Sequence, residues 1–306
     1  MRADLKSLLS QQGISRRDQL AELLGAVSAA YEREYGSVRS VVLFGGITLG
    51  EFRPRFSDID LAIVFGCGAE VPPNRLPEAI RGRVAEKPLL ADTFVSPKHV
   101  SRSTLRTMRS HDWRSWTTEG SYEQVTDTAY PFTLCDTWML HRHGLVLAGS
   151  EALEEFPFKE APPTTPRIEL RRLKWFAGRF ELAKPFGGLE GLDLAGEVIY
   201  YGTTFARVVY TLKTGRVIGR VASTRWYEDA VGGERGQYVR SLGEKRCCPD
   251  PDSLCPPDDP VADLWPVFVH YSQEVLAYAA PEIIGPDSLQ SRAEYLSQLR
   301  ATLAKI

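Results

Sequence analysis

Two carboxylates, Asp58 and Asp60, stand at the start of an apolar run that extends from Leu61 to Phe65. Residues two apart on an extended chain point to the same face of a sheet, so both side chains would share one face. Two like charges held that close are costly unless a cation sits between them. A hard divalent cation suits such a pair, and Mg²⁺ usually completes its ligand shell with substrate phosphates and water. The pair therefore predicts a metal site that works on a phosphate-bearing substrate.

A glycine pair, Gly45 and Gly46, ends the apolar run that precedes the carboxylates. Glycine N–H groups approach a phosphate without an intervening Cβ, so this turn is a candidate phosphate-binding loop. Ser57 either caps the turn and also hydrogen-bonds a phosphate or a carboxylate, or only caps the turn. Arg53 and Arg55 either contact a triphosphate or are solvated loop residues. Together these features indicate metal-assisted chemistry on a nucleoside triphosphate. The alternative is an ordinary strand–turn–strand in which an aspartate caps the turn.

A third carboxylate, Asp92, is the one acid in the apolar run LLADTFV. We expect a third strand over residues 88–95, and an acid inside such a strand is expensive unless it faces a polar site. Asp92 would then act as a third metal ligand or as the general base for an attacking hydroxyl. The alternative is an edge strand that turns Asp92 toward solvent, because a shift of one residue in register reverses its direction.

The apolar spacing along the chain predicts an α+β fold, with a mixed sheet flanked by helices in the N-terminal half and a helical bundle in the C-terminal half. The proline-rich stretch 160–166 suggests a linker. We therefore expect a catalytic domain over 1–158 and a helical substrate- and nucleotide-binding domain over 167–306. The helices are predicted at 17–35, 72–87, parts of 98–145, 167–184, 195–215, 220–232, 261–280 and 287–305.

Composition excludes some classes of protein. The 306 residues are 43% apolar and carry a net charge of −2, which argues against a protein that coats nucleic acid. No run of eighteen apolar residues is present, and the N-terminus does not resemble a signal peptide, so we expect a cytoplasmic protein with no membrane partner. The five cysteines do not have the spacing of zinc ligands.

The N-terminal pattern resembles the signature of the nucleotidyltransferase superfamily: a glycine followed by Gly or Ser, a short spacer, and Asp-x-Asp between hydrophobic strands. The resemblance implies a catalytic site made of Asp58, Asp60 and Asp92, with ATP as co-substrate and with one Mg²⁺ ion or two. It also implies that Gly45 and the second residue of the pair bind phosphate. That second residue is usually Ser, and Gly46 therefore removes one hydroxyl ligand.

The segment from Leu194 to Trp226 is similar to the aminoglycoside adenylyltransferases that modify streptomycin and spectinomycin. The residues that carry this similarity are Glu197, Arg207, Tyr210, Thr214, Gly215, Arg220, Ala222 and Trp226. The resemblance implies that Glu197 binds a cationic acceptor and that Arg207 and Arg220 bind the triphosphate. The alternatives are a solvated acid at the start of a helix for Glu197, and surface ion pairs or helix-capping charges for the two arginines.

Two tryptophans, Trp113 and Trp116, fall where that family places a tryptophan against its drug. A Trp ring is a good platform for a cation or a sugar face, although burial in a core is the alternative.

These expectations converge on a Mg²⁺-dependent enzyme that transfers AMP from ATP to a hydroxyl of a small-molecule acceptor. An aminoglycoside-like acceptor would imply a role in antibiotic resistance. Two alternatives stay open: a nucleotidyltransferase with a macromolecular acceptor, such as tRNA or a protein, and an inactive nucleotide-binding module. A nucleic acid would be a partner only in the first of these alternatives.

Overall fold

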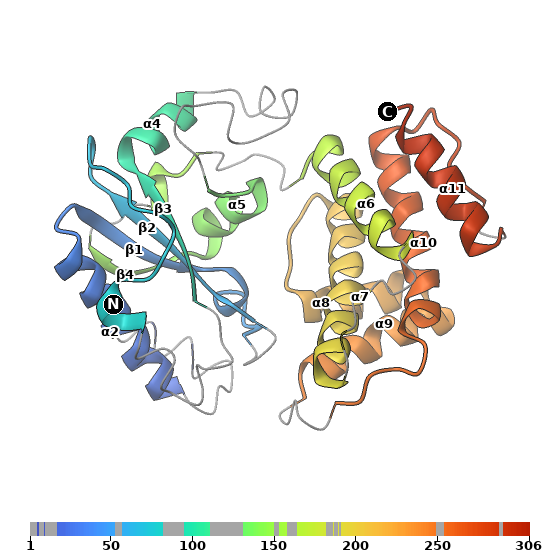
Figure 1. Ribbon diagram of the computed structural model, residues 1–306, viewed down its shortest axis with the longest axis horizontal. Coiled ribbons are helices and arrows are strands. Elements are labelled where there is room, and N and C mark those ends of the chain that lie inside the picture. The colour runs from blue at the N-terminus through green and yellow to red at the C-terminus, as the bar shows by residue number, and fades with distance from the viewer. Residues whose placement is uncertain are drawn as a thin grey trace. The chain divides into compact units, whose positions relative to one another are not determined.

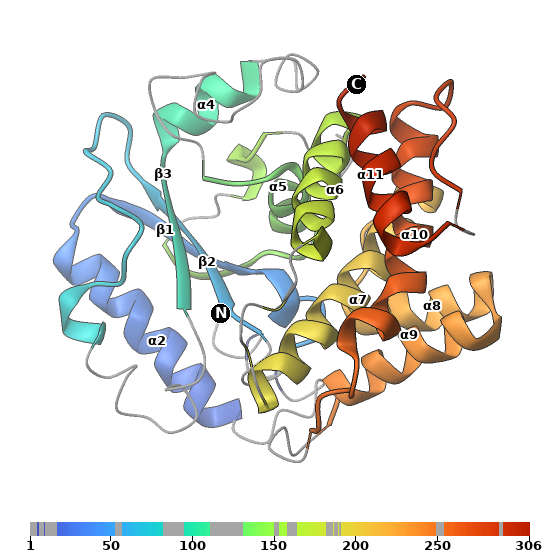
Figure 2. The same ribbon diagram turned by 45° about the vertical axis from the view of Figure 1, so that its right-hand side comes forward.

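The computed structural model describes residues 5, 9, 17–52, 57–81, 95–110, 131–149, 153–157, 164–181, 186, 189, 191–248, 254–287 and 290–306. The chain divides into two compact units, Met1–Ala161 and Pro162–Ile306 (Figure 1). The first unit contains a sheet with helices on it, and the second contains helices (Figures 1 and 2).

The sheet of the first unit has four described strands in the order β3-β2-β1-β4. β1 is antiparallel to β2 and to β4, whereas β2 is parallel to β3, so the sheet is mixed. This arrangement confirms the expected α+β class. The strands are β1 (Val38–Phe44), β2 (Ile59–Phe65), β3 (Val95–Ser101) and β4 (Leu145–Gly149).

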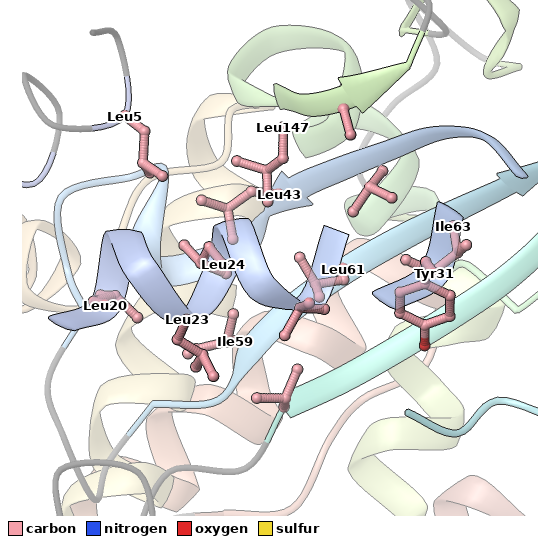
Figure 3. Close-up of a cluster of buried hydrophobic side chains, with 14 of the residues drawn as sticks. Leu5, Leu20, Leu23, Leu24, Tyr31, Leu43, Ile59, Leu61, Ile63 and Leu147 are labelled. Carbon is pink, nitrogen blue, oxygen red and sulfur yellow. The ribbon is translucent and has the colours of Figure 1, made fainter. Parts of the chain in front are cut away.

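One face of the sheet is covered by α2 (Arg17–Glu34), as predicted for residues 17–35. Leucines at helical spacing on α2 pack against alternate residues of β1 and β2, which point to this face because side chains alternate along a strand (Figure 3). The labelled side chains of this core include Leu20, Leu23, Leu24, Tyr31, Leu43, Ile59, Leu61, Ile63 and Leu147.

The opposite face of the sheet is covered by α4 (Arg102–Ser110) and α5 (Leu134–His143). The intervening residues of β1 and β2 point here, so this second core alternates with the first along each strand. It contains Val42, Phe44, Ala62, Val64, Val100, Leu105, Met108, Phe132, Met139, Leu140 and Phe156. Asp60, two residues before Ala62, lies on this face.

The third strand begins where the sequence predicts its end. β3 runs from Val95 to Ser101, and the predicted strand over 88–95 shares only Val95 with it. Residues 82–94, which include Asp92 and the last six residues of the predicted helix over 72–87, lie outside the described residues; within 72–81, residues 78–81 are helical. The prediction failed at 96–101 because Ser96, Pro97 and Lys98 interrupt any apolar run, while pairing with β2 holds the segment extended.

Among its described residues, the second unit contains the five predicted helices and also α9, which the sequence did not predict. α7 packs against α8, α9 and α10, while α6 packs against α10 and α11 (Figure 2). The described residues contain no helix long and apolar enough to cross a membrane. The helices are α6 (Pro166–Glu181), α7 (Gly191–Thr214), α8 (Arg220–Val231), α9 (Gly233–Arg246), α10 (Pro260–Ala279) and α11 (Arg292–Leu303).

The core of the second unit is rich in aromatic rings from α6, α7 and α10. Phe180 stacks on Phe268 with ring centroids 4.4 Å apart, and Phe205 stacks on Tyr271 at 4.7 Å. Stacked aromatic pairs at about these separations add to the stabilisation that comes from burying apolar area. These contacts tie α6 and α7 to α10, and so fix the helices that carry the candidate residues of this unit.

Candidate active site

The glycine turn follows β1 directly. Gly45 has a φ of +81°, a conformation that side chains other than glycine rarely adopt, and it opens a single 3-10 turn, η1 (Gly45–Ile47). The turn is closed by Thr48, whose backbone N–H and Oγ1 both donate to the Gly45 carbonyl, at 3.2 Å and 3.0 Å. A Cβ built on Gly46 has no atom within 4 Å, so the space beside Gly46 is open.

Gly45 lies directly against the carboxylate of Asp60. Phe44 and Asp60 are cross-strand partners in the β1–β2 ladder, which brings the next residue, Gly45, to the Asp60 side chain. A Cβ at position 45 would lie 2.2 Å from Oδ2 of Asp60 and 3.1 Å from its Cγ. Glycine is therefore required at position 45 for two reasons: its positive φ and the space that the Asp60 carboxylate occupies.

The two carboxylates differ in exposure. Asp58 is exposed in the residue before β2, and Asp60 is partly buried as the second residue of the strand. Both carboxylates act electrostatically on the same cation, Lys98, and raise the pKa of its ammonium. That both side chains share one face of the sheet stays a prediction.

Ser57 is buried, and its Oγ donates to the Glu51 carbonyl at 3.4 Å. The bond joins the two ends of the loop between η1 and β2, which supports a structural role in this loop; a contact between Ser57 and phosphate stays a prediction. Arg53 and Arg55 lie outside the described residues.

The structure adds Lys98 and Asp136, which the sequence analysis did not identify. Lys98 on β3 and Asp136 on α5 form an ion pair with Nζ 2.8 Å from Oδ2. The Lys98 ammonium also lies over the ring of Phe44, 5.4 Å from its centroid. Burial works against the charge of Lys98, but Asp136, Asp60 and Asp58 together outweigh it and raise the pKa of the ammonium. Lys98 thus shares an electrostatic site with both predicted carboxylates.

Asp136 is fixed by the start of α5. Thr133 caps the helix: its Oγ1 accepts from the Asp136 N–H at 3.1 Å, while the Thr133 N–H donates to Oδ2 of Asp136 at 3.0 Å. This reciprocal capping box is readable in the sequence as Thr-x-x-Asp before an apolar helix, and was the available signal for Asp136. No comparable signal marks Lys98.

The carboxylates of Asp58 and Asp60 are hard oxygen groups of the kind that Mg²⁺ prefers, and the exposure of Asp58 leaves room beside it for phosphate and water oxygens. Within the described part of the chain no group of three His, Cys, Asp or Glu side chains could hold a metal. The two carboxylates fit a divalent cation whose remaining ligands are phosphate and water oxygens. A third carboxylate from Asp92 stays a prediction, because that residue lies outside the described ranges.

Glu197 lies near the start of α7, partly buried. Burial raises the pKa of its carboxyl, and the nearby guanidinium of Arg179 opposes the rise. Arg179 is itself held by α7, because its Nε donates to the hydroxyl of Tyr201 at 3.1 Å. Glu197 is therefore a carboxylate in a partly desolvated setting, where binding a cation would relieve part of the cost of its charge.

The predicted phosphate ligands of this unit lie on two helices. Arg207 follows Glu197 by ten residues on α7, which separates them by about 15 Å along the helix axis. Arg220 begins α8, and its guanidinium lies over the ring of Tyr200 on α7, 4.7 Å from the centroid. Tyr200 and Arg207, seven residues apart, share one side of α7. Arg207 and Arg220 are thus on the same side of this helix.

Trp226 on α8 packs edge-on against Tyr210 on α7, with ring centroids 5.2 Å apart, and so joins the two helices. Tyr210 and Trp226 therefore have a packing role between α7 and α8. Trp113 and Trp116, the predicted acceptor platform, lie outside the described residues.

Part of the chain matches a family of known proteins. The family model of the nucleotidyltransferase domain matches residues 22–103, which include the glycine turn, Asp58, Asp60 and Lys98. No curated protein is significantly similar to the chain in sequence. Among solved structures, the chain is similar to spectinomycin adenyltransferase AAD(9) from Enterococcus faecialis, crystallised with ATP and spectinomycin. The TM-score is 0.54 at 13% identity, and the match covers 83% of this chain and 98% of that chain.

Proposed function

We propose that this chain, a nucleotidyltransferase that resembles the aminoglycoside adenylyltransferases, transfers AMP from ATP to a hydroxyl group of a small-molecule acceptor. The observation that carries the proposal is the approach of Gly45 to the Asp60 carboxylate inside the matched domain. This approach brings the glycine turn, which has open space beside Gly46, next to the carboxylate pair. Backbone N–H groups in such a turn can bind phosphate, and two carboxylates can hold the Mg²⁺ that accompanies a triphosphate.

The reaction would be an in-line displacement at the α-phosphorus. The acceptor oxygen forms a new P–O bond, the bond between the α-phosphorus and the α,β-bridging oxygen breaks, and pyrophosphate leaves. A Mg²⁺ ion held by Asp58 and Asp60 would neutralise charge on the phosphate oxygens and align the displacement. The backbone N–H groups of the glycine turn would hold the phosphates. Asp92 would take the hydroxyl proton or complete the metal site.

The residues of the second unit would hold the two substrates. Arg207 and Arg220, on the same side of α7, would bind the β- and γ-phosphates and so stabilise the leaving pyrophosphate. Glu197 would bind a cationic group of the acceptor, which its partly desolvated position supports.

An aminoglycoside or aminocyclitol is the acceptor class that best fits an acid in that position, because these compounds carry both ammonium groups and hydroxyls. AAD(9), whose fold is similar, was crystallised with spectinomycin. Modification of such a drug by this chain would confer antibiotic resistance.

The identity of the acceptor is tested by measuring the mass that each candidate acceptor gains. The protein is incubated with Mg²⁺ and each of ATP, GTP, CTP and UTP, in the presence of streptomycin, spectinomycin or bulk tRNA, and every acceptor is then weighed by mass spectrometry. The proposal predicts that a drug gains one AMP residue with ATP. If the nucleotide appeared only on tRNA or only on the protein itself, the proposed small-molecule acceptor would be wrong. If only a triphosphate other than ATP supported transfer, the proposed donor would be wrong.

A further inference from the structure

Lys98 is a charged residue of the candidate site that the proposed chemistry leaves without a role. It lies on β3 and is the cross-strand partner of Ala62, two residues from Asp60 on the same face of β2. Its side chain is 22% exposed, and it points into the face of the sheet that also carries Phe44 and Val64. A lysine in such a place costs free energy unless acids compensate its charge.

The groups that face Lys98 come from every element around it. Asp136 on α5 is its ion-pair partner, and Asp58 and Asp60 before and on β2 act on it electrostatically. The rings of Phe44 on β1 and Phe132 before α5 lie 5.4 Å and 6.0 Å from its ammonium. Asp136 thus contacts the ammonium directly, and Asp58 and Asp60 act with it to raise the pKa of Lys98.

Asp136 holds the ammonium in place, since the same Oδ2 that accepts from Lys98 also accepts from the Thr133 N–H of the helix cap. The Lys98–Asp136 pair is thus fixed to the start of α5 and does not depend on a substrate for its position.

We propose that Lys98 is the resident counter-ion of Asp58 and Asp60, and that it makes divalent-cation binding at these carboxylates depend on nucleotide binding. The inference rests on the proposed function, which places the cation at the two carboxylates. Without nucleotide, the ammonium already compensates part of their charge and repels a second cation. A triphosphate brings oxygens that can pair with the ammonium, so the repulsion falls and the cation and the nucleotide bind together.

The coupling is reciprocal: if the nucleotide strengthens cation binding through Lys98, the cation strengthens nucleotide binding by the same factor. Lys98 would therefore be a positioning residue, because it acts on substrate binding through the charge of the site. A lysine that served only to hold β3 against α5 would not affect this coupling.

The test measures Mn²⁺ affinity from the paramagnetic resonance signal of free Mn²⁺, with and without a non-hydrolysable ATP analogue. In the unmodified protein Mn²⁺ alone should bind weakly, and the analogue should strengthen its binding. Lys98→Met should bind Mn²⁺ alone about tenfold more tightly, the size expected when a unit charge is removed near a divalent cation. The analogue should then strengthen Mn²⁺ binding less. Lys98→Arg, which keeps the charge, should behave like the unmodified protein.

Asp136→Asn should change the Mn²⁺ affinity in the opposite direction. It also provides a test that does not require the Lys98→Met variant to fold. It leaves the ammonium to pair with Asp60 and Asp58 alone, so Mn²⁺ alone should bind more weakly. Unchanged Mn²⁺ affinity in both Lys98→Met and Asp136→Asn would overturn the inference while leaving the proposed function intact. Failure of the unmodified protein to bind Mn²⁺ even with the analogue would instead overturn the metal site itself, and the inference with it.

Discussion

The Cα of Gly45 faces the carboxylate of Asp60 so closely that a Cβ at position 45 would lie 2.2 Å from Oδ2. The two residues come from adjacent antiparallel strands, one just after β1 and the other at the start of β2. The glycine turn and the carboxylate pair are therefore one structural unit, in which the turn is shaped around the acid.

Replacing Gly45 with alanine should lower both stability and activity. The positive φ of Gly45 costs an alanine about 1–2 kcal/mol, and the new methyl group would displace the Asp60 carboxylate. Thermal unfolding and pyrophosphate release from ATP measure the two losses. Gly46→Ala is the matched control: its Cβ meets nothing within 4 Å, so its melting temperature should stay close to that of the unmodified protein. Equal tolerance of alanine at both positions would contradict the described geometry.

Replacing Gly46 with serine should strengthen nucleotide binding. The open space beside Gly46 accepts a hydroxymethyl group, and under the proposed function its hydroxyl would then reach a phosphate. A hydrogen bond to a charged phosphate contributes about 1.5–3 kcal/mol, so the KM for ATP should fall by about tenfold or more. Gly46→Ala, which adds the carbon without the hydroxyl, is the control. If the alanine and serine variants had the same KM, the hydroxyl would make no contact with phosphate.

The sequence predicted the elements whose apolar residues follow a clear period. The leucines of α2 and the long apolar stretches of α7 and α10 predicted these three helices. The pattern from Val41 to Phe65 predicted strands β1 and β2, the turn between them and the pair Asp58–Asp60. These features are local, because each depends on residues close together in the chain.

The elements that the sequence missed depend on distant partners. β3 has the sequence VSPKHVS, which is extended because β2 pairs with it, so its bounds and Lys98 could not be read from hydrophobicity. α9 has the sequence GERGQYVRSLGEKR, in which few apolar residues mark a buried face; it is fixed by packing against α7 and α8. The pairing of Lys98 with Asp136 joins positions 38 residues apart.

Acid should destabilise the first unit through His99, the neighbour of Lys98 on β3. Burial lowers the pKa of His99 below its ordinary value of 6.5, although its contact with the Pro72 carbonyl opposes the shift. The unfolded chain therefore takes up a proton more readily than the folded one. The stabilisation is complete above pH 6.5 and is lost as the pH falls through the lowered pKa. Urea unfolding between pH 7.5 and 5 should show a steeper loss of stability in the unmodified protein than in His99→Gln; equal slopes would contradict this account.

Glu197→Gln should weaken binding of the acceptor without weakening binding of ATP. Removing the carboxylate removes its interaction with a cationic acceptor, which is about 1.5–3 kcal/mol for a charge-assisted hydrogen bond. The KM for the acceptor should therefore rise by about 10- to 100-fold, while the KM for ATP stays the same. Asp193→Asn, an exposed acid on the same helix, is the control. An equal rise in both KM values would contradict the assignment of Glu197 to the acceptor.

The same variant should change the pH dependence of stability. Because burial raises the pKa of Glu197, the folded protein binds a proton more tightly than the unfolded chain does. Its contribution to stability is greatest below the ordinary pKa of 4.5 and declines as the pH rises through the raised value. Glu197→Gln removes this decline, so at neutral pH the variant should be at least as stable as the unmodified protein by thermal unfolding.

The most direct test of the account is pyrophosphate release from ATP by Asp60→Asn, in the presence of Mg²⁺ and an acceptor that the unmodified protein modifies. The asparagine keeps the size of the side chain beside Gly45 and removes the charge that would hold the metal. We predict that release falls by about 100-fold or more, with thermal unfolding unchanged, whereas Asp229→Asn, at an exposed position on α8, keeps full activity. Undiminished release by Asp60→Asn would contradict the central claim that the carboxylates of this site carry nucleotidyl transfer.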